Sequence, residues 1–213
     1  MFKRAFDLLA SLVGLIVFSP VFLALAIAIK LETTGPVFYR GPRVGLNGKP
    51  FKIFKFRTMV QDADKIGASS TSVGDPRVTR TGDLIRRYKL DEIAQFINVF
   101  LGDMSFVGPR PEVQKFVDLY TEEEKAILTV KPGITDWASI RFHNEGEIIA
   151  ASGIEDADEA YALLIRPEKL RLQLQYVKER SFFTDLKIIW STLATVVSTR
   201  ASGDDILTGP KNS

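Results

Sequence analysis

Asp91 and Glu92 are the residues of this sequence whose types and spacing most clearly suggest chemistry. The two carboxylates are adjacent in the run R-R-Y-K-L-D-E-I-A-Q-F-I-N-V-F-L-G-D-M-S-F-V-G-P-R-P, which ends at Pro111. Arg86 precedes them, and Arg110 follows them in a stiff turn between two prolines. Carboxylates can hold Mg²⁺, and arginines neutralise phosphates. Phosphoryl transfer needs both, because its transition state spreads negative charge over several oxygens.

Each of these residues also has a purely structural interpretation. Aspartate is a favoured N-cap and glutamate is favoured in the first turn, so the pair is also typical of a helix start. Apolar residues with helical spacing then predict a buried stripe: Ile93, Phe96, Ile97, Phe100, Leu101 and Met104. The combination of carboxylates and cations nevertheless favours a site for phosphate and metal. Since the sequence carries no P-loop or kinase signature, an aspartate carboxylate is a reasonable nucleophile.

Composition narrows the chemistry further. The chain has 213 residues, enough for one domain with a core and an appendage, and its net charge of +2 indicates no particular partner. It has no cysteine, which excludes disulfides and thiolate metal sites. The single histidine, His143, leaves little for Ser-His or Cys-His catalysis. Any metal is therefore expected to be a hard, oxygen-liking ion such as Mg²⁺ rather than zinc.

The N-terminal segment is predicted to be a membrane element. Leu8 to Ile29 carries no charge and is roughly as long as a bilayer-spanning helix, about 20 residues. Pro20 lies near its middle and predicts a kink, and Ser19 can bond back to a freed carbonyl. Cationic residues flank both ends, which favours a segment that enters and returns on one side. These residues leave open both a re-entrant hairpin and a kinked spanning helix.

The next segment reads as a β-hairpin. Pro36 to Arg43 and Phe51 to Met59 are β-prone runs on either side of the turn G-L-N-G-K. The second run, F-K-I-F-K-F-R, interleaves basic and aromatic residues, a pattern shared by nucleic-acid surfaces and by edges that rest on anionic lipid. Beside a membrane segment, contact with lipid or with a substrate phosphate is the better interpretation.

The rest of the chain is predicted to be mainly helical. Thr121 is a plausible N-cap three residues before Glu124, and Pro167 starts a later helix. Ser181 to Thr199 has helical apolar spacing, typical either of core or of an interfacial helix. The other expected elements are helices at 61–66, from Asp83, at 112–120, 122–128, 154–165 and 168–180, a loop at 67–74 and a turn at 130–135.

The predicted fold class is therefore α+β, mainly α. It comprises an N-terminal membrane helix at 1–34, then a helix-rich domain with a small β-hairpin and interfacial amphipathic helices at 35–200, which we expect to face the cytosol and hold the site. Residues 201–213 are expected to form a disordered tail.

Several motifs resemble the bacterial sugar transferases known as monotopic polyprenol-phosphate phosphoglycosyl transferases. They are the run at 75–111, K-F-R-T-M at 55–59, the Ser19-Pro20 break, P-G-I-T at 132–135 and D-L-K-I at 185–188. The resemblance covers nearly the whole chain and matches the small form of the family. It implies a re-entrant helix broken at Ser-Pro, Mg²⁺ dependence, and transfer of sugar-1-phosphate from a UDP-sugar to undecaprenyl phosphate with release of UMP.

The resemblance also implies roles for individual residues. Asp91 matches the nucleophile that forms a phosphosugar-aspartyl intermediate, and Glu92 matches its partner in metal binding or proton transfer. The pair would hold the Mg²⁺. Lys55, Arg86 and Arg110 match cationic positions that handle phosphates, and Arg141 and His143 are the expected substrate-binding residues of a later loop.

Three departures from the family pattern stand out. The usual D-E-L-P-Q is D-E-I-A-Q here, which loosens the helix start without touching the chemistry. A common aspartate is replaced by Gln173, so no role is carried to that position. The usual P-G-I-T-G-L-x-Q-V-x-G-R is P-G-I-T-D-W-A-S-I-R-F-H, so the family's arginine aligns with His143 and Arg141 lies two residues earlier. The sugar therefore stays unassigned.

The sequence thus predicts a membrane enzyme of glycoconjugate and polysaccharide biosynthesis, on the cytoplasmic face of a bacterial inner membrane. Its expected partners are a UDP-sugar, undecaprenyl phosphate, the lipid bilayer and downstream glycosyltransferases; nucleic acid is not expected, and a homodimer is left open. The alternative is a non-catalytic membrane-associated scaffold or anionic-lipid-binding module in which Asp91 only caps a helix. Asp91→Asn separates the two, because asparagine caps about as well as aspartate.

Overall fold

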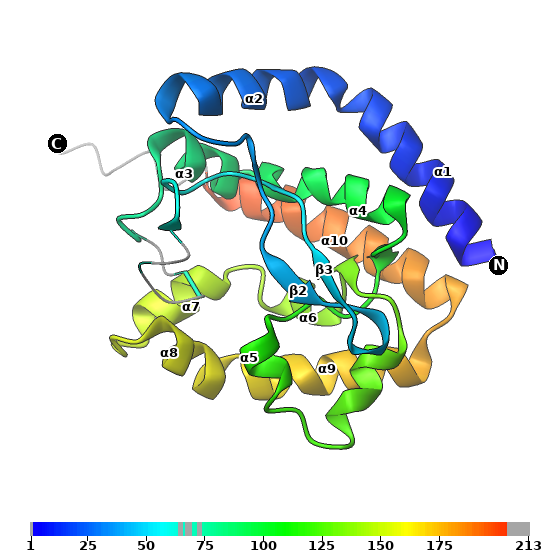
Figure 1. The fold of residues 1–213 in the computed structure, drawn as a ribbon. Helices are drawn as coiled ribbons and strands as arrows, with labels where there is room; N and C mark the ends of the chain where they lie inside the picture. Colours follow the sequence, from blue (N-terminus) through cyan, green and yellow to red (C-terminus); the bar gives the residue numbers. More distant parts are fainter. Residues whose placement is uncertain (1, 64–65, 67–69, 72–73, 204–213) are drawn as a thin grey trace, which may run out of the picture.

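The structure, a computed structural model, describes residues 2–63, 66, 70–71 and 74–203. It is mainly helical with three small two-stranded sheets, which confirms the predicted fold class. In Figure 1 the N-terminal helices arch along one side of the molecule, and the later helices form the opposite side around the short strands. The predicted helix at 61–66 and loop at 67–74 lie partly outside the described residues. The predicted disordered tail is wrong at 201–203, which belong to the last helix, and its remainder, 204–213, lies outside the described residues.

The N-terminal segment forms two helices, α1 (Phe2–Val17) and α2 (Ser19–Glu32), with a bend of 59° between them. The break falls at the predicted residues: Ser19 Oγ donates to the carbonyl of Ile16 at 2.8 Å, and Pro20 occupies the first turn of α2, where a missing N–H is tolerated. In the described part of the chain, no single helix is long and apolar enough to cross a bilayer. Only the bent pair, taken together, reaches that length and composition.

The predicted hairpin is confirmed, although it consists of two short ladders. Strand β2 (Pro42–Val44) pairs antiparallel with β3 (Pro50–Lys52), and β1 (Phe38–Tyr39) pairs antiparallel with β4 (Lys55–Phe56). The turn between β2 and β3 contains the 3-10 segment η1 (Leu46–Gly48), where Asn47 and Gly48 have positive φ angles of 55° and 74°. Asparagine and glycine tolerate that conformation, which is why this pair marks the turn.

The central stretch forms α3 (Arg80–Arg87), the 3-10 helix η3 (Leu90–Gln95) and α4 (Phe96–Leu101). Helix α3 begins three residues before the predicted start, because the side chain of Thr79 accepts from the amide of Gly82 and caps it. The predicted buried stripe is partly wrong: Met104 is buried, but Phe100 and Leu101 are 39% and 62% exposed. The fully buried positions are instead Ala94, Gln95, Asn98 and Val99. The tighter winding of η3 shifts the phase of the buried face.

Helix α1 packs along α4 and β5 (Ser105–Val107). Gly14 permits close approach, since a Cβ there would lie 2.7 Å from the ring of Phe96. The end of α2 packs into the same body, where Ile29 shares a buried cluster with Phe56 of β4 and Ile85 of α3. Both ends of the bent pair are therefore attached to one folded unit.

Residues 133–135 form a strand, β6 (Gly133–Thr135), where the sequence predicted a turn within 130–135. It pairs in parallel with β5, with Ser105 opposite Gly133. The pairing requires glycine, because a Cβ on Gly133 would lie 2.1 Å from the amide nitrogen of Gly108. Strands of three residues are too short to show the alternation by which strands are recognised.

The C-terminal half supplies the remaining helices. Pro167 lies in the first turn of α9 (Arg166–Glu179), as predicted. Thr121 and Glu124 form the predicted capping box, with backbone-to-side-chain hydrogen bonds of 2.7 and 3.2 Å, although the helix that follows is a 3-10 helix. Two short helices, α6 and α7, were not predicted. The elements are α5 (Gln114–Val117), η4 (Glu124–Thr129), α6 (Trp137–Arg141), α7 (Glu145–Ala151), α8 (Ala157–Leu164), α9 (Arg166–Glu179) and α10 (Phe182–Gly203).

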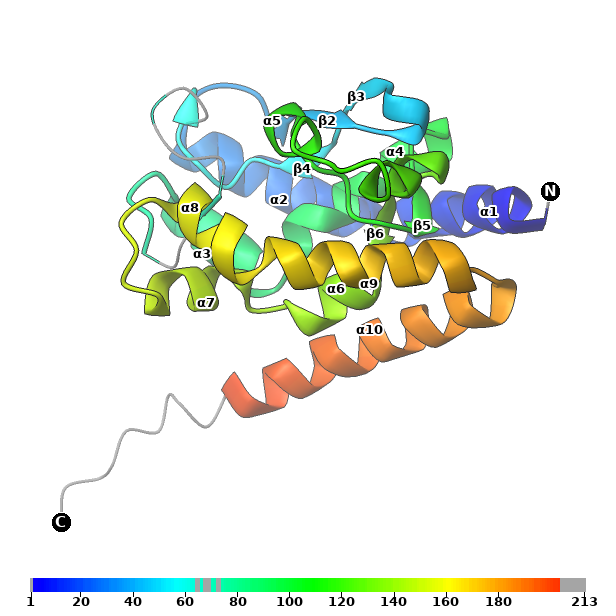
Figure 2. The same ribbon diagram turned by 90° about the horizontal axis from the view of Figure 1, so that it is seen from below.

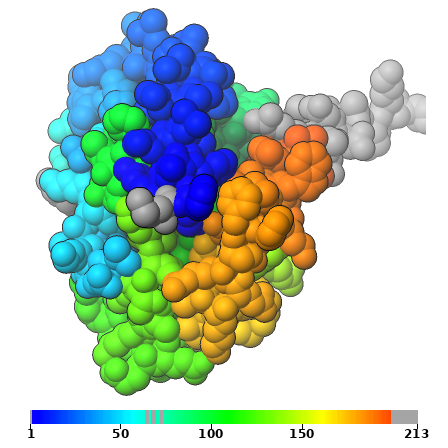
Figure 3. Space-filling model, turned by 90° about the vertical axis from the view of Figure 1, so that its right-hand side faces the viewer, coloured from blue at the N-terminus to red at the C-terminus, as the bar shows by residue number. Residues whose placement is uncertain are grey.

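Helix α10 runs along the edge of the molecule beside α9 (Figure 2). Its outer face is apolar, with Phe183 80% and Trp190 75% exposed. In Figure 3 the start of α1 lies beside α10, where the rings of Phe6 and Phe182 are 6.4 Å apart. The exposed apolar faces of α1 and α10 are therefore neighbours.

Candidate active site

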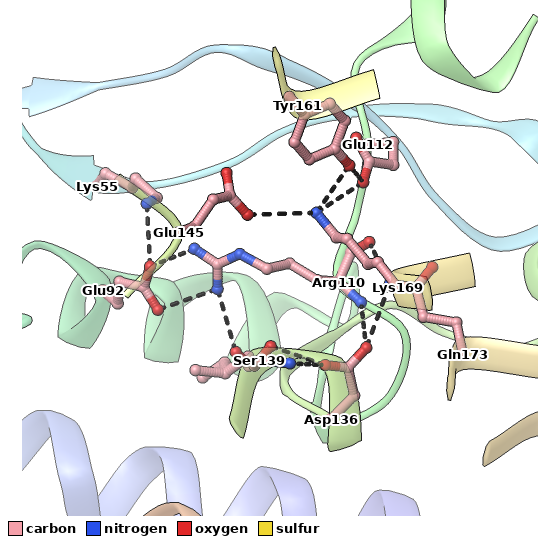
Figure 4. A network of polar contacts seen from close by, with 11 residues as sticks. Lys55, Glu92, Arg110, Glu112, Asp136, Ser139, Glu145, Tyr161, Lys169 and Gln173 are labelled. Atoms are coloured by element: carbon pink, nitrogen blue, oxygen red, sulfur yellow. Dashed lines mark hydrogen bonds and ion pairs between the residues drawn. The ribbon is translucent and has the colours of Figure 1, made fainter. Parts of the chain in front are cut away.

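The structure brings together four of the predicted site residues, from three separate elements. Lys55 Nζ lies 3.2 Å from Asp91 Oδ2 and 3.1 Å from Glu92 Oε1. Both guanidinium NH groups of Arg110 bind Glu92, one of them at 3.0 Å from Oε2 (Figure 4). Lys55 comes from β4, the carboxylates from η3, and Arg110 from the loop after β5. Lys55 thus links the two adjacent carboxylates, and Arg110 binds the second of them.

The backbone around Lys89 aims the carboxylates. Lys89 has φ 54°, in the left-handed region, which ends α3 and starts η3 in a new direction. Lys89 occupies the cap position and its side chain makes no capping bond, so the expectation that Asp91 caps this helix is wrong. Asp91 is only 8% exposed, and its carboxylate instead accepts a hydrogen bond from Lys55.

Charge pairing keeps Glu92 and Arg110 ionised. Burial opposes ionisation of Glu92, but the charges of Arg110 and Lys55 outweigh it and hold the pKa of Glu92 well below its usual range. Burial likewise disfavours the charge on Arg110, and Glu92 outweighs it, so the pKa of Arg110 is raised. Glu92 is therefore suited to orienting Arg110 rather than to taking up a proton.

Arg86 lies close enough to act on Asp91 electrostatically. Its Nε donates to Thr58 Oγ1 at 2.7 Å, which holds the guanidinium in place. Burial lowers the pKa of Arg86, and the negative charge of Asp91 opposes that change. Arg86 thus adds a third cation to the surroundings of Asp91.

Two residues from separate elements, Asp136 at the N-cap of α6 and Gln173 within α9, hold the main chain of Arg110. Its amide donates to Asp136 Oδ2 at 3.2 Å, and its carbonyl accepts from Gln173 Nε2 at 3.3 Å. Asp136 also caps α6 by accepting from the amide of Ser139 at 2.6 Å. Asp136 and Gln173 were noted in the sequence only as departures from the family pattern, with no role assigned to either.

A buried polar network adjoins the site and was missed by sequence reasoning. Lys169 Nζ lies 2.8 Å from Glu112 Oε1 and 3.0 Å from the hydroxyl of Tyr161, which itself donates to Glu112 (Figure 4). Glu145 lies 4.0 Å from the same Nζ. Glu112 directly follows Pro111, so the network ties the Arg110 loop to α8 and α9. A lysine on the buried face of a helix was the only available signal.

Arg141 and His143 are not brought into this cluster. Both are exposed at the end of α6 and just after it. His143 Nδ1 lies 3.2 Å from the carbonyl of Ile140, and the Arg141 guanidinium lies 6.0 Å from the ring centroid of Phe142. Within the described residues no hydrogen bond or ion pair connects them to Asp91, Glu92 or the three cations. Their predicted role in substrate binding therefore stays a prediction.

The carboxylates of Asp91 and Glu92 can hold a metal ion only if water or substrate oxygens complete its coordination. Among the described residues, no group of three or more acidic, histidine or cysteine side chains could hold a metal. Both oxygens of Glu92 accept from cations, whereas Asp91 Oδ1 has no hydrogen-bond partner in the described part of the chain. Mg²⁺ often takes one or two carboxylates and completes its shell with water and substrate phosphates. Asp91 and Glu92 fit that kind of site, not a cage made by the protein alone.

Polar residues of α1 connect the bent helix pair to the site region. Asp7, only 3% exposed, accepts from Ser105 Oγ and the amide of Phe106, both at 3.1 Å. Lys3 Nζ donates to the carbonyl of Val107 at 2.9 Å and also pairs with Asp185 of α10. These bonds fix α1 to β5, the strand that leads to Arg110.

The far end of the pair is fixed in the same way. Glu32, the last residue of α2, accepts from the amides of Arg80 and Thr81 at 2.8 and 2.9 Å, at the start of α3. A hydrogen bond from the Thr81 side chain lowers the pKa of Glu32 most, and the two amide bonds lower it further. Helix α2 is therefore held by the same body that binds α1.

Three cations around an adjacent carboxylate pair define a candidate site for a phosphorylated substrate. The chain belongs to the bacterial sugar transferase family, whose model matches residues 1–199. It is 38% identical over 199 residues to the UDP-N-acetylgalactosamine-undecaprenyl-phosphate N-acetylgalactosaminephosphotransferase of Aeromonas hydrophila, covering 92% of this chain and 44% of that protein.

Two further relatives have the same identity. The UDP-glucose:undecaprenyl-phosphate glucose-1-phosphate transferase of Escherichia coli (strain K12) matches at 38% over 195 residues, 90% of this chain and 39% of that protein. The sugar transferase EpsL of Bacillus subtilis (strain 168) matches at 38% over 195 residues, 92% of this chain and 87% of that protein. This chain thus spans less than half the length of the first two relatives.

Proposed function

We propose that this protein transfers sugar-1-phosphate from a UDP-sugar to undecaprenyl phosphate and releases UMP, the first membrane step in building a glycan on a lipid carrier. The observation that carries the proposal is the position of Asp91, whose carboxylate is held by Lys55 through one oxygen while the other has no hydrogen-bond partner among the described residues. The names of the relatives from Aeromonas hydrophila and Escherichia coli, which specify undecaprenyl-phosphate acceptors, support the choice of substrates.

The reaction has two displacement steps. In the first, Asp91 Oδ1 attacks the β-phosphorus of the UDP-sugar, and the bond to the oxygen bridging the two phosphorus atoms breaks, so UMP leaves with that electron pair. In the second, a phosphate oxygen of undecaprenyl phosphate attacks the phosphorus of the aspartyl intermediate. The acyl phosphate bond breaks, and the Asp91 carboxylate is regenerated as the lipid diphosphate sugar departs.

The cations of the site serve both steps. Lys55 and Arg86 flank Asp91, and Arg110 is oriented by its bidentate pair with Glu92, so positive charge surrounds the reacting phosphorus. Glu92 holds Arg110 and remains ionised throughout, because its pKa is depressed. Mg²⁺ bound by Asp91 and Glu92 would neutralise charge on the diphosphate of the donor.

The bent helix pair is proposed to enter the cytoplasmic leaflet and return, which places the enzyme on the cytoplasmic face of the inner membrane. What supports this is that both ends of the pair are hydrogen-bonded to the same body, through Asp7 and through Glu32. A helix that crossed the bilayer would separate its ends. Labelling of single cysteines placed at each end in intact cells tests this, and labelling from opposite sides of the membrane would refute re-entry.

Intact-protein mass spectrometry tests the chemistry directly. Detergent-purified protein is incubated with Mg²⁺ and a panel of UDP-sugars, the native chain beside Asp91→Asn. A sugar-phosphate mass added only to the native chain is expected. A UMP-release assay with undecaprenyl phosphate accompanies it, to detect turnover where the intermediate is short-lived. Native protein that neither gains mass nor releases UMP with any donor would favour the scaffold alternative.

A further inference from the structure

Two positions at which this sequence departs from the family pattern are in direct contact. Position 136 is aspartate where the pattern has glycine, and position 173 is glutamine where an aspartate is common. Gln173 Nε2 donates to Asp136 Oδ2 at 3.2 Å, although one lies at the N-cap of α6 and the other within α9. Both side chains are fully buried. One departure therefore adds a buried carboxylate where the other removes one.

The pair holds Arg110 by its main chain. Asp136 accepts the Arg110 amide at 3.2 Å, and Gln173 donates to the Arg110 carbonyl at 3.3 Å (Figure 4). The guanidinium at the other end of Arg110 binds Glu92 through two NH groups. Because prolines on both sides already restrict the loop, fixing the Arg110 amide and carbonyl sets the direction of its side chain.

The groups around positions 136 and 173 suit one buried carboxylate. They are poorly suited to two carboxylates, or to none. The hydrogen-bond donors that reach Asp136 are all neutral: the Arg110 amide, Gln173 Nε2, and the amide and hydroxyl of Ser139 at 2.6 and 2.7 Å. A second buried anion beside it would be repelled. With none, the Arg110 amide would lose its acceptor. Gln173 Oε1 has no partner among the described residues, as expected of an amide whose role is to donate.

We propose that Asp136 and Gln173 are a pair of positioning residues for Arg110, and that their site requires one carboxylate, which this chain supplies from the N-cap of α6. Neither side chain touches the reacting atoms; both act through Arg110. The effect on turnover rests on the proposed function. Since Asp136 also caps α6, the same carboxylate links Arg110 to the helix that ends at Arg141.

The experiment exchanges the two positions. Asp136→Gly leaves no carboxylate at the two positions, and Gln173→Asp leaves two. The double variant has one carboxylate again, now at position 173 instead of 136. We expect each single variant to lower kcat for UMP release about tenfold or more, with KM for the UDP-sugar changing less than about threefold, and the double variant to recover to within about threefold of native kcat. Ser139→Ala is the control, because it removes a donor to Asp136 that does not touch Arg110; kcat should stay within about twofold of native.

Thermal unfolding of the same proteins gives a readout that does not depend on activity. The unfolding midpoint should fall in both single variants and recover in the double variant. Additive losses in the midpoint would refute the exchange of carboxylates, whatever the activity. Recovery of the midpoint without recovery of kcat would refute the positioning of Arg110. If native protein releases no UMP with any donor, the proposed function fails, and the midpoints still decide whether positions 136 and 173 compensate each other.

Discussion

The buried pair of Glu112 and Lys169 predicts a large loss of stability when either charge is left alone. Both side chains are 9% exposed, their charged atoms are 2.8 Å apart, and Tyr161 binds both. Lys169→Met keeps a side chain of similar length and removes the charge. It leaves the Glu112 carboxylate buried with a phenol and no cation in contact, apart from the more distant influence of Arg43.

The size of the effect follows from the burial. Breaking a buried ion pair by removing one partner costs about 3–5 kcal/mol. For a chain of this length, 1 kcal/mol corresponds to about 2–4 °C in the melting temperature, so the expected fall is about 6–20 °C. The double variant Glu112→Leu/Lys169→Met removes both charges from the interior and should recover most of the loss.

The assay is thermal unfolding followed by circular dichroism in detergent at pH 7. Lys178→Met is a matched control on the same helix, because Lys178 pairs with Glu123 at 3.4 Å and both side chains are at least 70% exposed. Such an exposed pair contributes about 0–1 kcal/mol. A fall for Lys169→Met no larger than that for Lys178→Met would refute the reasoning.

The same pair predicts a pH signature. Burial opposes the charge on Glu112 but Lys169 outweighs it, so the pKa of Glu112 is lowered, and the pKa of Lys169 is raised mainly by Glu112 against its own burial. The contribution of Glu112 is present above its unfolded pKa of about 4.3 and is lost as pH falls through the folded pKa. That of Lys169 is present below about pH 10.4 and is lost as pH rises through its folded pKa. Lys169→Met removes the largest cause that lowers the pKa of Glu112 and leaves the opposing effect of burial, so that variant should lose less stability than the native protein as pH falls.

Three further predictions concern other contacts. Gly133→Ala should separate β5 from β6, because its Cβ would lie 2.1 Å from the Gly108 amide nitrogen; we expect a loss of about 3 kcal/mol or more in chemical unfolding, and an unchanged midpoint would contradict the close approach. Asp7→Ala leaves Ser105 Oγ and the Phe106 amide without their acceptor, so the folded protein should lose about 1–3 kcal/mol of stability. Helix α1 should also be held less tightly, which faster proteolysis near the N-terminus would show; native-like cleavage would argue against the attachment. Thr121→Ala removes one half of the capping box and should lower the melting temperature by about 2–4 °C, with Thr121→Ser close to native as its control.

The sequence predicted the elements that have strong local signals. The proline break in the N-terminal helix, the asparagine-glycine turn and the Thr121 capping box follow from residue types whose backbone preferences are local. Pattern and resemblance together singled out the carboxylates and the cations, and the structure places Lys55 beside Asp91, a contact that neither had predicted.

What was missed depends on distant contacts. The parallel pairing of β5 with β6 involves three residues on each strand, and it is permitted by the glycines at 108 and 133 rather than favoured by β-prone residues. The charge on Lys169 gave no sign that a partner from position 112 would neutralise it in the core. Asp7 offered a readable clue, since an acid at the edge of an apolar helix usually has a partner. Which partner it has could be known only from the fold.

The order in which the chain is made gives the attachment of α1 a further meaning. Lys3, Arg4 and Asp7 are synthesised long before their partners: Val99 is 95 residues after Arg4, Phe106 is 99 after Asp7, and Asp185 is 182 after Lys3. During synthesis the apolar segment therefore exists before anything can hold its polar end. Its capture therefore requires β5 and α10 to have been made and the body to have folded. If the bent pair enters the membrane as proposed, a nascent chain stopped before β5 would carry a helix whose orientation is not yet fixed by these contacts.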